Sequence, residues 1–354
     1  MEIGIGRGVA AIVPIASKSS SRFLRYALIS SNWQLDKAAT GSTFDAVSRN
    51  DVRSVTIAQW SIVDQSLIVR YLDNADLRIA RAIQAKSNLI HLLRERRASI
   101  ETELLFGGTW ADTSQVWCGP GRSGWRSLPA RALFDEVIER DAVDLPMLSV
   151  TISRGVILQS EYMRTTRSKK DQSRSDRSQY KVAQPGDIIY NKMRAWQGAA
   201  GVTMHKGIVS PAYVVVRPRS DADPSYFGRV MRTEQFAREA ERWSYGITSD
   251  MWSLRPHHFK TIQFLVPPLA EQIKIVEDLS SRTAELDKAV AAAEREIALL
   301  REYRTRLIAD VVTGKKDVRA EAASLPDIDP LELASVLSGV VSSEEEEVGD
   351  ADAD

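Results

Sequence analysis

The chain has 354 residues, with 47 Lys and Arg against 47 Asp and Glu, and one cysteine. A single cysteine excludes an internal disulfide framework and fits a reducing compartment. No run of about 18 apolar residues is present, which argues against a membrane span. We therefore expect a cytoplasmic protein of two or three domains that does not enter a membrane.

The zero net charge hides an asymmetry between the body of the chain and its end. Residues 320–354 contain eleven of the acidic side chains and no Lys or Arg, which leaves the preceding residues with a balance of +11. A basic body favours a polyanionic ligand. Ordinary solubility charge is an equally compatible explanation.

A long internal repeat organises the sequence. Residues 65–107 align with residues 272–314 at a constant offset of 207, without a gap. Identical residues occur at Gln65, Ile68, Val69, Leu72, Ala82, Ile90, Leu92, Leu93, Arg94, Glu95, Arg97 and Gly107. The repeat predicts a long helix, a domain, and a second copy of that helix.

Weaker matches extend the repeat upstream. Pro14, Phe23 and Arg25 match residues 204 positions later, and Gly41, Thr43 and Thr56-Ile57 match at 205. Residues 115–212 have no upstream counterpart. The simplest explanation is that the chain begins inside the first copy of a domain whose second copy is complete.

In chain order, we expect six segments. Residues 1–62 are the remnant of a first α/β domain, in which the apolar run 9–13 is a strand equivalent to Val214–Val216; a signal peptide is the weaker alternative for this run. Residues 63–107 are the first long helix, 108–129 a linker, 130–268 the complete mixed domain, 269–314 the second long helix, and 315–354 an acidic, disordered tail. Short strands are expected at 187–190 and 213–217, and a helix stop at Gly314.

Both long helices carry a seven-residue apolar spacing, which is typical of a coiled-coil seam. The positions on the first helix are Leu72, Ile79, Lys86, Leu93, Ile100 and Asp76, Ile83, Ile90, Arg97, Leu104; those on the second are Leu279, Leu286, Ala293, Leu300, Leu307 and Thr283, Val290, Ile297, Arg304, Val311. Neither helix is apolar all round, so each needs a partner. The two helices pairing within one chain is the favoured arrangement, and pairing between chains is the alternative. The predicted fold class is α+β, with mixed domains joined by an antiparallel coiled coil.

Candidate nucleic-acid contacts gather in the domain between the helices. The first cluster is the basic, Ser- and Gln-rich stretch Arg164, Arg167, Lys169, Lys170, Arg174, Arg177 and Lys181, and the second is Asn191, Lys192, Arg194 and Gln197 around Trp196. Cationic and amide side chains suit phosphate contacts and base edges. The alternatives are a surface loop without a ligand and a Trp196 that belongs to the core. Tyr245, Thr248, Ser249 and Trp252 are candidates for the same face.

Catalytic patterns are scarce. The four histidines are His91, His205, His257 and His258. We expect His91 to be solvated on the first long helix, and His257-His258 has no Cys or carboxylate at metal-ligand spacing. The sequence lacks a phosphate-binding loop of the Walker type, a dinucleotide fingerprint and a nucleophile elbow. It also lacks the Asn-Pro-Pro-aromatic tetrapeptide of adenine methyltransferases. We expect no catalytic site, no metal and no cofactor.

Several of these motifs together resemble the specificity subunits of type I restriction-modification systems. Their target-recognition domain is similar to residues 185–189, 191–198 and 207–213, and their spacer region to residues 93–97, 267–272, 300–304 and 312–319. The resemblance implies two recognition domains held apart by antiparallel helices, each reading half of a split site in double-stranded DNA. It implies as partners DNA adenine methyltransferase subunits and a restriction-translocase subunit, and no catalysis by the chain itself.

The chain departs from that pattern in three places. The first domain lacks about a hundred residues, residues 60–65 replace the Pro-Pro-Leu-Ala-Glu-Gln of residues 267–272, and the acidic tail is additional. A second hypothesis is therefore a structural coiled-coil adaptor that docks methyltransferase subunits without reading DNA. A third, a fused nuclease or methyltransferase, has no supporting residue cluster.

Overall fold

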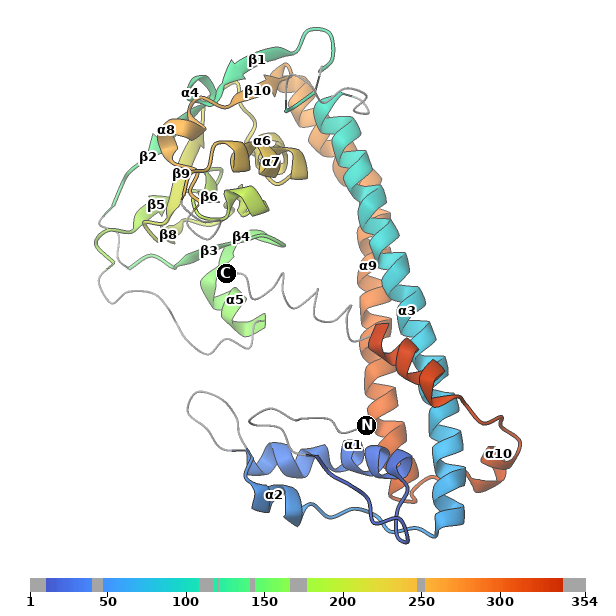
Figure 1. Ribbon diagram of the computed structural model, residues 1–354. Coiled ribbons are helices and arrows are strands. Elements are labelled where there is room, and N and C mark those ends of the chain that lie inside the picture. The colour runs from blue at the N-terminus through green and yellow to red at the C-terminus, as the bar shows by residue number, and fades with distance from the viewer. Residues whose placement is uncertain are drawn as a thin grey trace. The chain divides into compact units, whose positions relative to one another are not determined.

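The computed structural model describes residues 11–39, 47–107, 117–119, 121–140, 144–165, 177–246 and 252–339. The chain divides into two compact units, which are described separately (Figure 1). Unit 1 comprises residues 1–91 and 290–345, and unit 2 comprises residues 92–289 with 346–354. Both long helices, α3 (Ile62–Phe106) and α9 (Leu269–Val312), contribute a part to each unit.

An antiparallel four-stranded sheet lies at the centre of unit 2. Its order is β2 (Phe134–Val137), β9 (Tyr213–Pro218), β6 (Ile188–Asn191) and β7 (Ala200–Val202). The strands are rich in valine and isoleucine, and the two central ones are buried on both faces, which suits β-branched side chains. Strands β6 and β9 confirm the strands predicted at residues 187–190 and 213–217.

Three two-stranded ribbons and several short helices surround this sheet. The ribbons are β1 (Arg126–Pro129) with β10 (Gln263–Val266), β3 (Leu148–Thr151) with β4 (Gly155–Leu158), and β5 (Lys181–Ala183) with β8 (Gly207–Val209). The short helices are α4 (Ala130–Leu133), α5 (Gln159–Thr165), η1 (Ala195–Gln197), α6 (Pro224–Val230), α7 (Glu234–Arg242) and α8 (Pro256–Phe259). Strand β1 lies in the segment that the sequence predicted to be a linker. The strand has only four residues and follows a Gly-rich stretch, so the sequence pattern did not indicate it.

In unit 2, the end of α3 packs antiparallel against the start of α9. Ile100 and Leu104 share one apolar core with Ile275 and Leu279. Two ion pairs flank the contact: Arg97 Nε lies 3.0 Å from Asp287 Oδ1, and Arg282 lies 3.4 Å from Glu103. From Arg97 to Glu103 the chain runs forward along α3, whereas their partners run backward along α9, from Asp287 to Arg282. The two helices are therefore antiparallel.

In unit 1, the first part of α3 packs against the last part of α9 in the same sense. Ile79, Ile83 and Ile90 form an apolar cluster with Ala293 and Ile297. The predicted seam and the pairing of the helices within one chain are thereby confirmed (Figure 1). The fold class is α+β, as the sequence predicted.

The polar residues that interrupt the seam in unit 1 are paired with one another. The carboxylate of Asp76 is 1% exposed and accepts two hydrogen bonds from the Arg304 guanidinium, at 2.9 and 2.8 Å. It also accepts one from the Tyr26 hydroxyl at 3.3 Å. Lys86 forms an ion pair with Glu296. A bidentate pair between facing helices offsets the desolvation of its carboxylate, so the seam tolerates these charges.

Helices α1 (Ser21–Ala38) and α2 (Arg49–Ser54) lead into α3 in unit 1. The side chains of Phe23, Tyr26 and Ala27 on α1 pack into one core with residues from the start of α3 and the end of α9. The strand predicted for residues 9–13 is wrong for residues 11–13, which are not in a strand. Residues 9 and 10 lie outside the described part of the chain.

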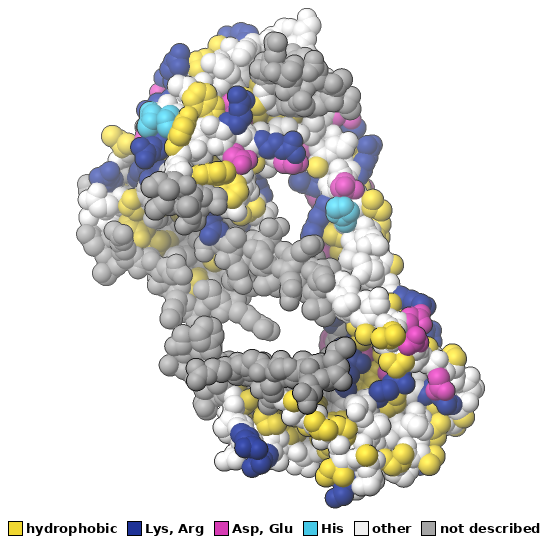
Figure 2. All heavy atoms as spheres, viewed as in Figure 1, with side chains coloured by type: hydrophobic (Ala, Val, Ile, Leu, Met, Phe, Trp, Pro, Cys, Tyr) yellow, Lys and Arg dark blue, Asp and Glu magenta, His cyan; other side chains and the backbone are white. Residues whose placement is uncertain are grey.

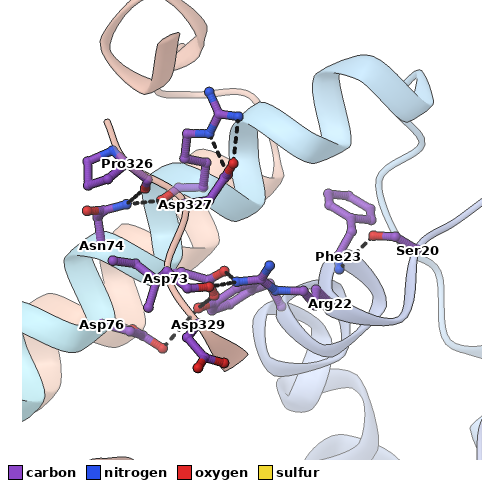
Figure 3. Close-up of polar contacts among 12 residues, drawn as sticks. Ser20, Arg22, Phe23, Asp73, Asn74, Asp76, Pro326, Asp327 and Asp329 are labelled. Carbon is purple, nitrogen blue, oxygen red and sulfur yellow. Dashed lines mark hydrogen bonds and ion pairs between the residues drawn. The ribbon is translucent and has the colours of Figure 1, made fainter. Parts of the chain in front are cut away.

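The first part of the acidic tail is folded onto unit 1, which differs from the expected disorder. Helix α10 (Arg319–Ala323) and a second helix at residues 330–339 follow α9. Arg70 Nε donates to Asp327 at 2.8 Å, Asn74 donates to the Pro326 carbonyl at 2.8 Å, and Arg22 donates to the Ile328 carbonyl at 3.2 Å (Figure 3). The tail therefore accepts hydrogen bonds from side chains of α1 and α3 through the Asp327 carboxylate and through backbone carbonyls. Composition does not predict such contacts between distant segments. Residues 340–354 lie outside the described part.

Within the residues that the structure describes, no helix combines the length and the apolar content that a membrane crossing requires.

Candidate nucleic-acid interface and helix junctions

The second predicted cluster forms a braced loop between β6 and β7. Asn191 ends β6, and its side-chain oxygen accepts a hydrogen bond from the Met193 backbone N–H at 2.9 Å. The Trp196 indole N–H donates to the Met193 carbonyl at 2.9 Å. Gly198, with φ of +84°, ends the 3₁₀ turn that follows. These bonds hold Lys192, Arg194 and Gln197 on a short and rigid segment, which suits side chains that must present a fixed pattern.

The structure brings Trp252 to this loop, as the sequence suggested for that residue. The rings of Trp196 and Trp252 meet edge to face at 5.5 Å between centroids. The Leu254 N–H donates to the Lys192 carbonyl at 2.9 Å. Both indoles are only partly buried. Trp196 is thus neither a core residue nor an isolated stacking platform: it ties the loop to the segment that precedes α8.

Lys181 lies inside the domain and not on its surface. It is 8% exposed, and its ammonium donates to the Tyr213 carbonyl at 2.8 Å. Burial lowers the pKa of Lys181, and the positive charge of Lys192 lowers it further. The Lys192 N–H donates to the Ala212 carbonyl at 3.2 Å, next to the Tyr213 carbonyl that accepts from Lys181, so Lys181 lies beside the β6–β7 loop. Lys181 itself is committed to a backbone carbonyl.

The remaining candidates are placed unevenly. Arg164 is exposed near the end of α5, and Arg177 is partly buried just before β5. The residues of the list that lie outside the described part are Arg167, Lys169, Lys170, Arg174, Thr248 and Ser249. On the face seen in Figure 2, the Lys and Arg side chains of unit 2 are interspersed with acidic and hydrophobic ones.

An aromatic group beside α8 was not predicted as a cluster. The ring of Tyr245, which is 57% exposed, lies 4.8 Å from that of His258, and His257 lies 4.0 Å from His258. Burial lowers the pKa of His258, and the neighbouring His257 and Arg255 lower it further, which favours the neutral ring. Neutral rings of this kind can stack on nucleobases. Only the aromatic character of Tyr245 signalled this in the sequence.

The acidic and histidine side chains of the described residues could serve a metal site or a turn. No group of three or more His, Cys, Asp or Glu side chains among them is arranged to hold a metal ion. Asp187, which follows a turn, accepts two hydrogen bonds of 2.8 Å from Arg217 and one from the Gln184 backbone N–H. It therefore fixes a turn at the start of β6.

The repeat is visible as two equivalent junctions, one in each unit. In unit 1, the buried Gln65 side chain accepts from the Ser20 N–H at 3.0 Å and donates to the Lys18 and Trp60 carbonyls at 2.8 and 3.0 Å. In unit 2, Gln272 accepts from the Asp223 N–H at 2.7 Å and donates to the Asp221 and Pro267 carbonyls at 3.0 and 2.9 Å. Each glutamine joins the first turn of a long helix to the N-terminus of a domain helix, α1 or α6.

At each junction a carbonyl at the end of the other long helix accepts a hydrogen bond, although the two donors come from different places in the repeat. The Trp60 indole N–H donates to the Val312 carbonyl at 2.8 Å, and the Tyr226 hydroxyl donates to the Leu105 carbonyl at 3.0 Å. Leu105 and Val312 are 207 positions apart. Gly107 and Gly314 then end the helices with φ of +83° and +80°, a left-handed conformation that glycine adopts without strain. The helix stop predicted at Gly314 is confirmed.

The junctions also correct the register of the upstream repeat. Ser20 and Asp223 cap equivalent helices, which gives an offset of 203 and not the 204 assigned from Phe23 and Arg25. The starts of α2 and α8 are 207 positions apart and their ends, Ser54 and Phe259, are 205 positions apart, so the offset of 205 from Thr56-Ile57 stays a prediction. At α1 and α6, the capping residues and their bonds to the junction glutamines define the equivalence, and they shift the sequence alignment there by one residue.

No protein-family model and no curated protein matches the chain. Among solved structures, it is similar to the HsdS subunit from Thermoanaerobacter tengcongensis, with 16% identity, a TM-score of 0.41, and 85% of this chain and 72% of that one covered. It is similar to a chain from a study of complex assembly and conformational transition of the type I R-M system, with 18% identity, a TM-score of 0.47, and 83% and 71% covered. It is also similar to the type I restriction-modification system S subunit from M. genitalium, with 14% identity, a TM-score of 0.40, and 87% and 73% covered.

Proposed function

We propose that this chain is the sequence-specific DNA-recognition subunit of a type I restriction-modification complex. The observation that carries the proposal is the pair of equivalent junctions around Gln65 and Gln272, which shows one structural module used twice along two paired helices. A duplicated module on an antiparallel pair of helices suits a ligand that is itself split into two similar parts. The motif resemblance of residues 185–213 and 267–272 supports the same function.

In this proposal, unit 2 contacts duplex DNA with the β6–β7 loop. Lys192 and Arg194 supply positive charge, and Asn191 and Gln197 supply amides that can hydrogen-bond to base edges. Arg164 and the basic residues at 167–174 extend the contact along the phosphates. Lys181 does not take part directly, because its ammonium is buried against the Tyr213 carbonyl. The paired helices act as the spacer and as the docking platform for DNA adenine methyltransferase subunits, with a restriction-translocase subunit completing the complex.

The proposal makes a salt-dependent affinity the first test. Fluorescence anisotropy with a labelled duplex library, in the presence of the methyltransferase subunits, should give affinities that fall steeply with salt, because each phosphate contact releases counterions. Lys192→Ala and Arg164→Ala should each reduce the slope of log affinity against log salt by about 1. The matched control is Arg126→Ala, whose exposed guanidinium pairs with Asp221 at 3.5 Å. A slope that neither variant changes would count against the proposed contact surface.

Methylome sequencing tests the biological function directly. Cells with the gene should methylate adenine at a defined motif, and cells without it should lose that methylation. The restored motif would also give the target sequence. Unchanged methylation in both strains would contradict the proposal.

A structural adaptor without DNA affinity is the second candidate. The burial of Lys181, one of the predicted DNA contacts, favours it. An adaptor would co-purify with a methyltransferase subunit but would leave duplex anisotropy unchanged at low salt. The same titration therefore separates the two functions.

A further inference from the structure

A segment that follows α9 crosses the first part of α3 in unit 1, and the proposed function gives it no role. We call this segment, residues 326–339, the strap; it includes the second helix of the tail. At its start, the Pro326 carbonyl accepts a hydrogen bond of 2.8 Å from the Asn74 side chain (Figure 3). Farther along, Val336 and Leu337 pack against the apolar cluster of the helix seam. The strap therefore covers part of the helix pair in unit 1.

Two ion pairs fasten the strap to α3, and both lie at the surface. Arg70 Nε lies 2.8 Å from Asp327 Oδ1. Arg81 Nη2 lies 2.6 Å from Glu332 Oε1. The exposed fractions of these four side chains range from 28% for Arg70 to 76% for Asp327. Exposed ion pairs contribute little to stability and are screened by salt, so they hold the strap only weakly.

The apolar part of the attachment depends on few side chains. Of the fourteen strap residues, ten are exposed, and only Leu333 is buried, with 4% of its surface exposed. A cavity of about 560 Å³ also remains between α3, α9 and residues 321–325, which lead into the strap. A segment with little buried apolar surface opens at a lower free-energy cost than the core beneath it. The strap can therefore detach while the helix pair stays folded.

The repeat gives unit 2 an equivalent helix face, on the first part of α9. At the offset of 207, Arg81 corresponds to Lys288, which is exposed. Arg70 corresponds to Glu277, which is also exposed and whose carboxylate would repel Asp327 of the strap. The chemistry of the strap therefore suits unit 1, and the equivalent charged residues of unit 2 stay accessible.

We propose that the strap competes with a methyltransferase subunit for the face of α3 in unit 1. The inference rests on the proposed function, in which the paired helices are the docking platform for these subunits. The first copy docks on the accessible face of unit 2, and the second copy docks on unit 1 only while the strap is detached. The apparent affinity of the second copy is then reduced by the fraction of chains whose strap is detached. The strap thereby makes two sites of one repeat unequal.

The test titrates the full chain with the purified methyltransferase subunit and follows the number of bound copies by native mass spectrometry and calorimetry. The parent chain should bind a second copy about tenfold more weakly than the first. Leu333→Asp removes the buried anchor of the strap, so it should tighten binding of the second copy by about tenfold and leave the first unchanged. Leu331→Asp is the matched control, because Leu331 lies on the same helix and is 78% exposed. It should bind both copies as the parent chain does.

The expected gain of affinity guards against misfolding, because a damaged chain would bind more weakly. Hydrogen exchange is the second measurement: residues 330–339 should lose protection when the second copy binds to the parent chain. Equal affinities of the two copies for the parent overturn the proposal.

The proposal also fails if the second copy binds Leu333→Asp no more tightly than Leu331→Asp, or if residues 330–339 stay protected in the complex with two copies. In each of these outcomes the first copy still binds, so the proposed function stands. If no chain binds any copy, the docking role in the proposed function fails, and the inference fails with it.

Discussion

Replacing the junction glutamines tests whether the two modules are energetically equivalent. Gln272→Leu keeps most of the side-chain volume but removes three hydrogen bonds of 2.7 to 3.0 Å to backbone groups. At roughly 1 kcal/mol for each bond, we expect a loss of about 3 kcal/mol in the free energy of unfolding. Gln65→Leu removes three bonds of 2.8 to 3.0 Å and should cost the same.

The assay is urea denaturation followed by far-ultraviolet circular dichroism and tryptophan fluorescence. Gln59→Leu is the control, because Gln59 is exposed and lies six residues before Gln65; it should change stability by less than about 0.5 kcal/mol. If the two units unfold in separate transitions, each glutamine variant should shift only the transition of its own unit. A loss below about 1 kcal/mol for either variant would refute the argument from buried hydrogen bonds.

Three further predictions concern single sites. Asp76→Ala should destabilise unit 1 by about 3 kcal/mol, since it leaves Arg304 without its bidentate partner, and the double variant with Arg304→Ala should lose less than the sum of the single losses in a denaturation cycle. Lys181→Met should leave duplex affinity within about twofold of the parent while Lys192→Ala lowers it, and a larger effect of Lys181→Met in the anisotropy titration would contradict the buried role assigned to it. Burial raises the pKa of Cys118 to about 11; since the thiolate is the reactive form, the native thiol should react slowly with Ellman's reagent at pH 8 and rapidly once the chain is unfolded, and fast reaction in the native state would contradict it.

The long helices could be predicted because their signals repeat. A seven-residue spacing and a gapless match of 43 residues define α3 and α9 and the seam between them. Asp76 is a charged residue at an apolar seam position, and its partner Arg304 is 228 positions away. Pairing between distant segments depends on the fold, and one sequence does not specify it.

The short elements were harder to predict for a different reason. Strand β1 has four residues and follows a Gly-rich stretch, so its hydrogen bonds to β10 are the main evidence for it. The folded part of the tail depends on ion pairs such as that of Arg70 with Asp327, while its acidic composition resembles that of a disordered segment. In the candidate interface, Asn191 and Trp196 lie on one braced loop as their spacing suggested. The burial of Lys181 followed from its place in β5, which residue type alone does not reveal.

The equal spacing of the two closures along each helix limits how the protein can change length. Forty residues separate Gln65 from Leu105 on α3, and forty separate Gln272 from Val312 on α9. The helices run in opposite directions, so Gln65 lies near Val312 and Gln272 lies near Leu105. An insertion in one helix alone would change the distance between the junctions along that helix only, and one of these pairs would separate. Natural or engineered relatives with a longer or shorter rod should therefore carry matched insertions or deletions in both helices, and a change confined to one helix should be found only together with a broken closure.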